Sequence, residues 1–202
     1  MNVSRAAAAG LAALLFAATP ESGQEPLQRE EAERMAGKLA VIVAQSFTPT
    51  PPDREPARTS FTDREVNAYF KYIAYDQMPQ GLVDPTITIG GGGHVELRAW
   101  VDLDEVRDSR QRSLLDPMAY VSGMMETHVE GALTTTRGMG TFALGSATLG
   151  GVSVPRSLVF ELIAYFTRTS DDPNGVDLNE PFVLPAGIRD VTTVLGTATV
   201  VQ

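Results

Sequence analysis

The spacing of hydrophobic and polar positions changes twice along this chain, and each change marks a different kind of element. From Pro26 to Phe47, apolar residues such as Met35 and Ile42 recur at helical spacing, and the first half of the stretch is charged. Acidic residues come early and a lysine comes late, which suits the dipole of a helix. The pattern predicts an amphipathic N-terminal helix within residues 20–47.

Prolines end this first helix. The run Thr48-Pro-Thr-Pro-Pro52 is incompatible with a helix and favours an extended path. Residues 48–60 are therefore expected to form a proline-rich linker. The sequence Thr62-Asp-Arg-Glu65 then has the pattern of a capping box, with apolar residues behind it at helical spacing. A short helix is expected from Asp63 to Tyr75.

The period then becomes two, which is typical of strands. The β-branched stretch 86–89, the glycines Gly90 to Gly93 and the alternating stretch 95–103 predict one hairpin. Residues 127–137 and 139–149, separated by a glycine, predict a second. Two further short strands are expected within 188–201.

One helix in the C-terminal half is apolar around most of its circumference. It is expected from Arg156 to Thr169, with Pro155 well suited to its first turn. Such a helix is expected to be enclosed, and the strands contain glycines that allow a sheet to bend. The predicted fold class is α+β, with a strongly curved antiparallel sheet wrapped around this apolar helix in a domain over residues 61–202.

The first residues have the features of an export signal. Arg5 is the only charge before Glu21, and Ala6 to Ala18 is an apolar run of thirteen residues. A signal peptide needs an apolar run of about 7–15 residues, whereas spanning a bilayer takes about 20. A signal peptide is predicted over residues 1–19, with a periplasmic or secreted location. The alternative is a cytoplasmic alanine-rich helix.

Composition narrows the possible functions. The 202 residues include 25 acidic and 16 basic ones, for a net charge of −9. This charge argues against a sequence-independent nucleic-acid binder, which needs cations for the phosphates. The absence of cysteine excludes disulfides, thiolate metal sites and cysteine nucleophiles. An exported chain without disulfides suggests a bacterial envelope protein held together by its core.

Candidate chemistry is sparse. The glycines at 90–93 offer backbone amides to an anion, or simply form a hairpin turn. His94 and His128 would need to lie on adjacent strands beside a carboxylate, such as Glu96 or Glu130, to bind a metal. No G-x-S-x-G motif supports a serine nucleophile. No catalytic residue, metal or cofactor is therefore expected, and the protein is predicted not to be an enzyme.

An acidic cluster offers a second possible cation site. The spacing of its carboxylates lacks the glycine and the twelfth-position glutamate of an EF-hand, so a solvated strand end and loop is the alternative. Its residues are Asp102, Asp104, Glu105 and Asp108.

Three motifs support a family resemblance. Phe61-Thr-Asp-Arg-Glu-Val-Asn-Ala68 precedes the strands, Val152-Ser-Val-Pro155 opens the apolar helix, and Phe182-Val-Leu-Pro-Ala-Gly-Ile188 precedes the last strands. Over about residues 61–202, this order resembles bacterial envelope proteins of the TULIP-like group, relatives of the bactericidal permeability-increasing and synaptotagmin-like-mitochondrial lipid-binding domains. The residues that match the motifs of that group are Thr62, Glu65, Asn67, Leu184, Pro185, Gly187 and Ile188.

The resemblance implies a curved antiparallel sheet around a helix, with a groove that holds a lipid acyl chain in many such domains. The predicted function is non-enzymatic binding of a lipid or another hydrophobic small molecule. The alternatives are an envelope scaffold with a filled core that binds another protein, and a metal-dependent hydrolase that uses the two histidines and the acidic cluster. The expected wall residues of the groove are Leu97, Ala99, Val101, Phe142, Leu144, Phe160, Ile163 and Phe166.

Overall fold

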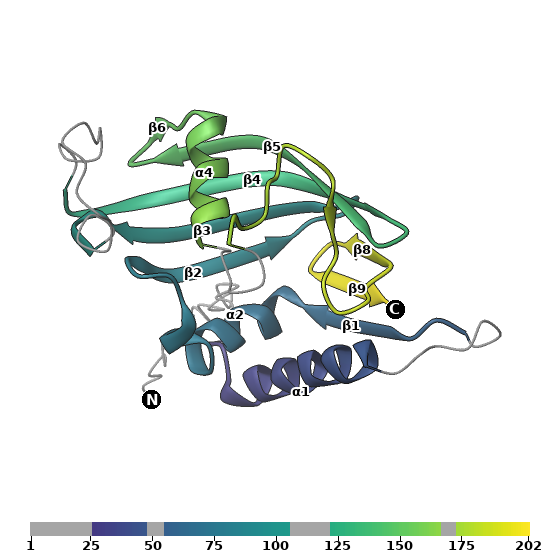
Figure 1. Cartoon of the computed structure of the whole chain (residues 1–202). Helices are drawn as coiled ribbons and strands as arrows, with labels where there is room; N and C mark the ends of the chain where they lie inside the picture. Colours follow the sequence, from purple (N-terminus) through teal and green to yellow (C-terminus); the bar gives the residue numbers. More distant parts are fainter. Residues whose placement is uncertain (1–25, 48–54, 106–121, 167–172) are drawn as a thin grey trace, which may run out of the picture.

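The computed structural model describes residues 26–47, 55–105, 122–166 and 173–202 (Figure 1). Over these residues the chain is α+β with antiparallel sheets, as the sequence predicts. The helices are α1 (Arg29–Ser46), α2 (Asp63–Tyr72), the 3₁₀ helix η1 (Tyr75–Gln77) and α4 (Arg156–Phe166). The strands are β1 (Arg58–Thr62), β2 (Leu82–Ile89), β3 (His94–Asp102), β4 (Met124–Thr136), β5 (Met139–Leu149), β6 (Val152–Ser153), β7 (Phe182–Val183), β8 (Asp190–Val194) and β9 (Thr197–Val201).

The larger sheet has the order β2-β3-β4-β5-β6, with β7 also paired to β5. Both predicted hairpins are confirmed as β2–β3 and β4–β5. The glycine run forms the turn of the first hairpin, where a Cβ on Gly93 would lie 2.0 Å from the carbonyl oxygen of Leu133. Gly93 also has a φ of 84°, which favours glycine. Close approach of two backbones is therefore the reason for glycine at this position.

The smaller sheet has the order β1-β9-β8, so it joins an early strand to the last two. The predicted pair of strands around Gly196 is confirmed as β8 and β9. The predicted linker, by contrast, is wrong over residues 58–60, because β1 starts at Arg58 and pairs with Val201 of β9. The partner strand β9 is distant in the sequence, so no local pattern around residues 58–60 indicates that β1 forms.

Helix α4 lies across one face of the larger sheet (Figure 1). Within the described residues it ends at Phe166, and the predicted remainder to Thr169 lies outside them. That the sheet is strongly curved and wraps around this helix stays a prediction.

The predicted signal peptide and residues 48–54 of the predicted linker also lie outside the described residues. Among the described helices, none is both long enough and apolar enough to cross a membrane.

The predicted capping box starts α2. The backbone amide of Glu65 donates to the hydroxyl of Thr62 at 3.2 Å, and the amide of Thr62 donates to the Glu65 carboxylate at 2.9 Å. Together these bonds satisfy two amides that a helix start would otherwise leave unpaired. The helix is shorter than predicted, since it ends at Tyr72 and η1 follows after a break.

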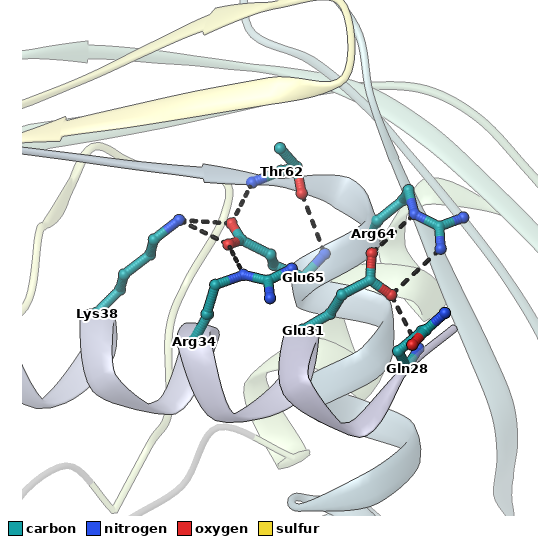
Figure 2. A network of polar contacts seen from close by, with 7 residues as sticks. All are labelled: Gln28, Glu31, Arg34, Lys38, Thr62, Arg64 and Glu65. Carbon is teal, nitrogen blue, oxygen red and sulfur yellow. Dashed lines mark hydrogen bonds and ion pairs between the residues drawn. The ribbon is translucent and has the colours of Figure 1, made fainter. Parts of the chain in front are cut away.

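The same Glu65 carboxylate joins α2 to α1 (Figure 2). Lys38 donates to its two oxygens at 2.8 and 2.6 Å, and Arg34 lies 3.4 Å away. One turn earlier on α1, Glu31 accepts from Arg64 at 2.9 and 3.2 Å. Alternating ion pairs therefore connect the two helices over more than one turn.

The Glu65 side chain is only 7% exposed, so its charge has to be stabilised by the protein. Burial opposes ionisation of this carboxyl. Hydrogen bonds from Lys38 and from the Thr62 amide outweigh that effect and hold the pKa of Glu65 below its ordinary value. A carboxylate in this position stabilises the fold only while it is ionised.

The E65Q substitution tests this network. It leaves Lys38 with a neutral partner, and we expect it to lower the free energy of unfolding by about 2 kcal/mol at neutral pH. Because the folded pKa is depressed, the contribution of Glu65 is present above the unfolded pKa of about 4.5 and is lost as pH falls through the folded pKa. The stability of the variant should therefore vary less with pH below about 4.5 than that of the wild type. Urea unfolding at several pH values measures both effects.

The matched control is E33Q, which neutralises an exposed glutamate of α1 that has no ion pair among the described residues. It should change the free energy of unfolding by less than about 0.5 kcal/mol. Equal effects of E65Q and E33Q would show that the buried carboxylate does not join the helices.

Candidate functional site

The predicted wall residues of β3 share the face of the larger sheet that α4 covers. Leu97 pairs directly with Val129, and Val129 pairs with Ala147. Directly opposed residues in an antiparallel sheet point to the same side. The face that bears this row, called here the apolar sheet face, also carries Ala99 and Val101, two residues apart along the strand.

Helix α4 packs on the part of the apolar sheet face formed by β4 and β5. The buried residues Ala147, Val159 and Phe160 form one hydrophobic cluster, against which other apolar side chains pack. Four of the eight predicted wall residues are brought together there: Phe142, Leu144, Phe160 and Ile163.

Three further predicted wall residues lie on β3. Leu97, Ala99 and Val101 lie on the same face of the sheet, two strands away from β5, and are not members of that cluster. Phe166 is the last residue of α4, and its side chain lies outside the described part. The prediction therefore combined a packed cluster and a neighbouring strand into one wall.

Burial varies across this wall. Phe160 and Ala99 are each 3% exposed. The other five described wall residues are only half-buried, and they come from β3, β5 and α4. Among the described residues, no large side chain is less than 2% exposed. The apolar sheet face is thus covered in part, most closely where the Phe160 ring packs. The five half-buried residues are Leu97, Val101, Phe142, Leu144 and Ile163.

The opposite face of the sheet is polar. Glu96 accepts from Arg98 at 2.6 Å and lies 2.8 Å from the imidazole of His128. The hydrogen bond from Arg98 is the largest effect on Glu96, and with that from His128 it holds the pKa of Glu96 below its ordinary value, although partial burial opposes this. Beside them, Ser146 donates to Glu130 at 3.0 Å. Polar contacts thus connect Glu96 to His128 and Glu130 to Ser146 across neighbouring strands.

The two histidines are not brought together. His94 pairs with Ala132, whereas His128, four residues before Ala132 on β4, pairs with Arg98. At strand geometry this offset is about 13 Å, too far for two ligands of one metal. Among the described residues, no three histidine or carboxylate side chains are grouped so that they could hold a metal ion.

The acidic cluster binds backbone amides. Asp102 accepts from the amides of Asp104 and Glu105 at 3.0 and 3.2 Å. Asp104 in turn accepts from Gly123 at 3.0 Å, and Glu105 accepts from Gly81 at 3.0 Å. Within the described part of the cluster, the carboxylates thus connect the end of β3 to the backbone at Gly81 and at Gly123. Asp108 lies outside the described residues.

The structure also has a pocket that the sequence analysis missed. It lies between α2 and β2 and has a volume of about 590 Å³, within the range of small-molecule sites. Apolar side chains line it together with charged ones from α2 and from the start of β2. This α2–β2 pocket includes Leu27, Phe70, Tyr75, Met78 and Ile87 as apolar or aromatic residues, and Asp63, Arg64, Lys71 and Asp84 as charged ones.

Asn67 fixes the wall of this pocket. Its side-chain amide donates to the carbonyl of Ile87 at 2.9 Å, and its carbonyl oxygen accepts from the amide of Ile87 at 2.7 Å. The side chain thereby imitates a neighbouring strand at the outer edge of β2. Two further residues limit pairing at that edge. Pro85 lacks an amide proton, and the amide of Gly196 donates to the carbonyl of Ile89 at 2.8 Å.

Two features of the sequence pointed towards this pocket without identifying it. Pro85 inside a strand pattern indicates an edge strand, and the register shift between Val83 and Thr86 falls at this proline. Asn67 lies two residues after the capping glutamate, on a helix whose start was predicted. Its partner Ile87 is 20 residues away, and no local pattern connects the two.

The comparisons with known proteins identify no relative. No model of a protein family matches the chain, no curated protein matches it, and no solved structure matches its fold. The resemblance to the TULIP-like group stays a prediction.

The N67A substitution tests the edge-strand contact. It leaves the amide and carbonyl of Ile87 without their partner, and we expect it to lower the free energy of unfolding by about 1–3 kcal/mol. The freed edge should also promote pairing between molecules, so sedimentation velocity should show more self-association than in the wild type as concentration rises.

The control for N67A is N179A, which removes an exposed asparagine whose side chain, among the described residues, bonds locally to Asp177. It should leave both stability and sedimentation near wild-type values. A stable N67A variant that associates no more than N179A would contradict the role given to Asn67.

Proposed function

We propose that this protein is a non-enzymatic envelope protein that binds a hydrophobic ligand, a lipid acyl chain, between the apolar sheet face and α4. The sheet curves around the helix, as in the TULIP-like domains that the sequence resembles, and the ligand lies in the groove between them. The protein reaches the periplasm or the outside of the cell through its N-terminal signal peptide.

One observation carries the proposal most directly. Five predicted wall residues, from two strands and from α4, line one face and are half-buried. A core that packs only its own side chains usually buries its large apolar residues almost completely. Partial cover by α4 leaves apolar surface on β3 that an acyl chain can cover in addition.

The energetics of such binding need no specific polar contact. Each buried CH₂ group contributes roughly 0.8 kcal/mol. A chain of about ten buried methylenes laid along Leu97, Val101 and Ile163 therefore gains roughly 8 kcal/mol, which is comparable to the cost of its lost freedom on binding. No cofactor and no catalytic group take part.

A scaffold function is the second candidate, and a different surface favours it. The C-terminal half of α1 and the residue after it expose apolar side chains: Val41 is 47%, Val43 50% and Phe47 82% exposed. No charged residue occurs between Leu39 and Phe47. A protein partner would bind at this end of α1, because the edge of β2 is already occupied by Asn67.

The I163D and L97W substitutions test the proposed groove. The first introduces a charge beside Phe160, and the second fills the space above β3 with an apolar ring. Both should weaken binding of a dansyl-labelled undecanoic acid by at least about tenfold, measured by fluorescence titration. The second variant keeps the face apolar, so it tests the site even if the first fails to fold.

The control is E161Q on the exposed side of α4, which should bind the labelled acid like the wild type. Circular dichroism shows which variants are folded. Folded L97W that binds the labelled acid as tightly as E161Q would contradict the groove and favour the scaffold function.

A further inference from the structure

The α2–β2 pocket lies at the border of the apolar sheet face. Ile87 lines the pocket, and it pairs directly with Leu97, the predicted wall residue of β3. The two side chains therefore point to the same side of the sheet. With strands about 4.8 Å apart, β2 lies roughly 14 Å from β5, on which α4 packs. A ligand with a tail can span this distance.

The charges of the pocket are not balanced by its own ion pairs. Arg64 is engaged by Glu31, at 2.9 and 3.2 Å. In the described part of the chain, Lys71 makes no ion pair, and its ammonium lies 5.4 Å from the centre of the Tyr72 ring. The carboxylates of Asp63 and Asp84 likewise make no ion pair with a described residue. The pocket thus offers one ammonium and two carboxylates to a ligand.

The backbone around Asp84 supports a role for its side chain. Its φ is 47°, in the left-handed region that non-glycine residues rarely adopt. The register of β2 with β3 shifts at this point, and the irregular backbone places Asp84 at the lining of the pocket. Irregular backbone of this kind often occurs at binding sites.

We propose that the α2–β2 pocket binds the zwitterionic head of an amphipathic ligand, with an ammonium group against Asp84 and a phosphate against Lys71. Tyr75, which is 67% exposed, and Phe70 add aromatic surface that also favours a cation. The tail then passes Ile87 onto the apolar sheet face. This inference rests on the proposed function for the tail, but the pocket binds the head through its own residues.

Calorimetric titration of the full chain tests the inference. The probes are dihexanoyl phosphatidylethanolamine, which has the ammonium, and dihexanoyl phosphatidylglycerol, which lacks it. The wild type should bind the first about tenfold more tightly, the effect of one hydrogen bond to a charged group. Asp84→Asn should remove most of this preference, and asparagine tolerates the left-handed backbone. Lys71→Met should weaken binding of both lipids.

The matched control is Asp76→Asn, on η1 beside the pocket but not in its lining, which should keep the preference of the wild type. Equal affinity of the wild type for the two lipids would overturn the inference. A preference that survives Asp84→Asn would overturn it as well.

Free phosphoethanolamine separates the two possible sources of the head group. If it binds more weakly than the lipid, and still depends on Asp84, the pocket takes a lipid head and the tail contributes. If it binds as tightly as the lipid, and depends on Asp84, the pocket takes a water-soluble zwitterion and the proposed tail site fails. If both lipids bind with equal affinity, the result supports the tail site and contradicts the proposed head-group site.

Discussion

The buried carboxylate of Glu65 is the contact on which the arrangement of the N-terminal half depends. It closes the capping box with Thr62, so it fixes where β1 ends and α2 begins. It also accepts from Lys38, so it fixes α1 against α2 (Figure 2). A buried charge without these donors would cost several kcal/mol, and the carboxylate therefore links the stability of β1, α1 and α2.

The position of α2 in turn determines the edge of the larger sheet. One turn of α2 carries both Glu65, which faces α1, and Asn67, which binds the backbone of Ile87 in β2. At the other end of the chain, buried Gln202 donates to the carbonyls of Ile42 in α1 and of Ala186 at 2.8 and 2.6 Å. Polar side chains at a few positions thus join α1 and α2 to the edge of the larger sheet and to the C-terminus, and they position the α2–β2 pocket.

The sequence predicts local elements well and tertiary partners poorly. The capping box, the two hairpins and the glycine turn follow from patterns within about a dozen residues, and the structure confirms them. The sequence predicts linker for the first three residues of β1, because the partner strand β9 lies more than a hundred residues away. The pocket was missed for the same reason, since Asn67 and Ile87 meet only through the packing of α2 on β2. Alternation along a strand indicates which of its residues share a face, but it cannot tell which half of that face α4 covers.

The most direct test of a ligand on the apolar sheet face is native mass spectrometry of the protein purified from its own cells, followed by organic extraction. The account predicts a protein mass increased by one lipid, and an extract whose main component carries an acyl chain. A protein that keeps its bare mass under conditions that preserve known lipid complexes would contradict it. The apolar sheet face would then be a filled core, and the exposed end of α1 would become the leading binding surface.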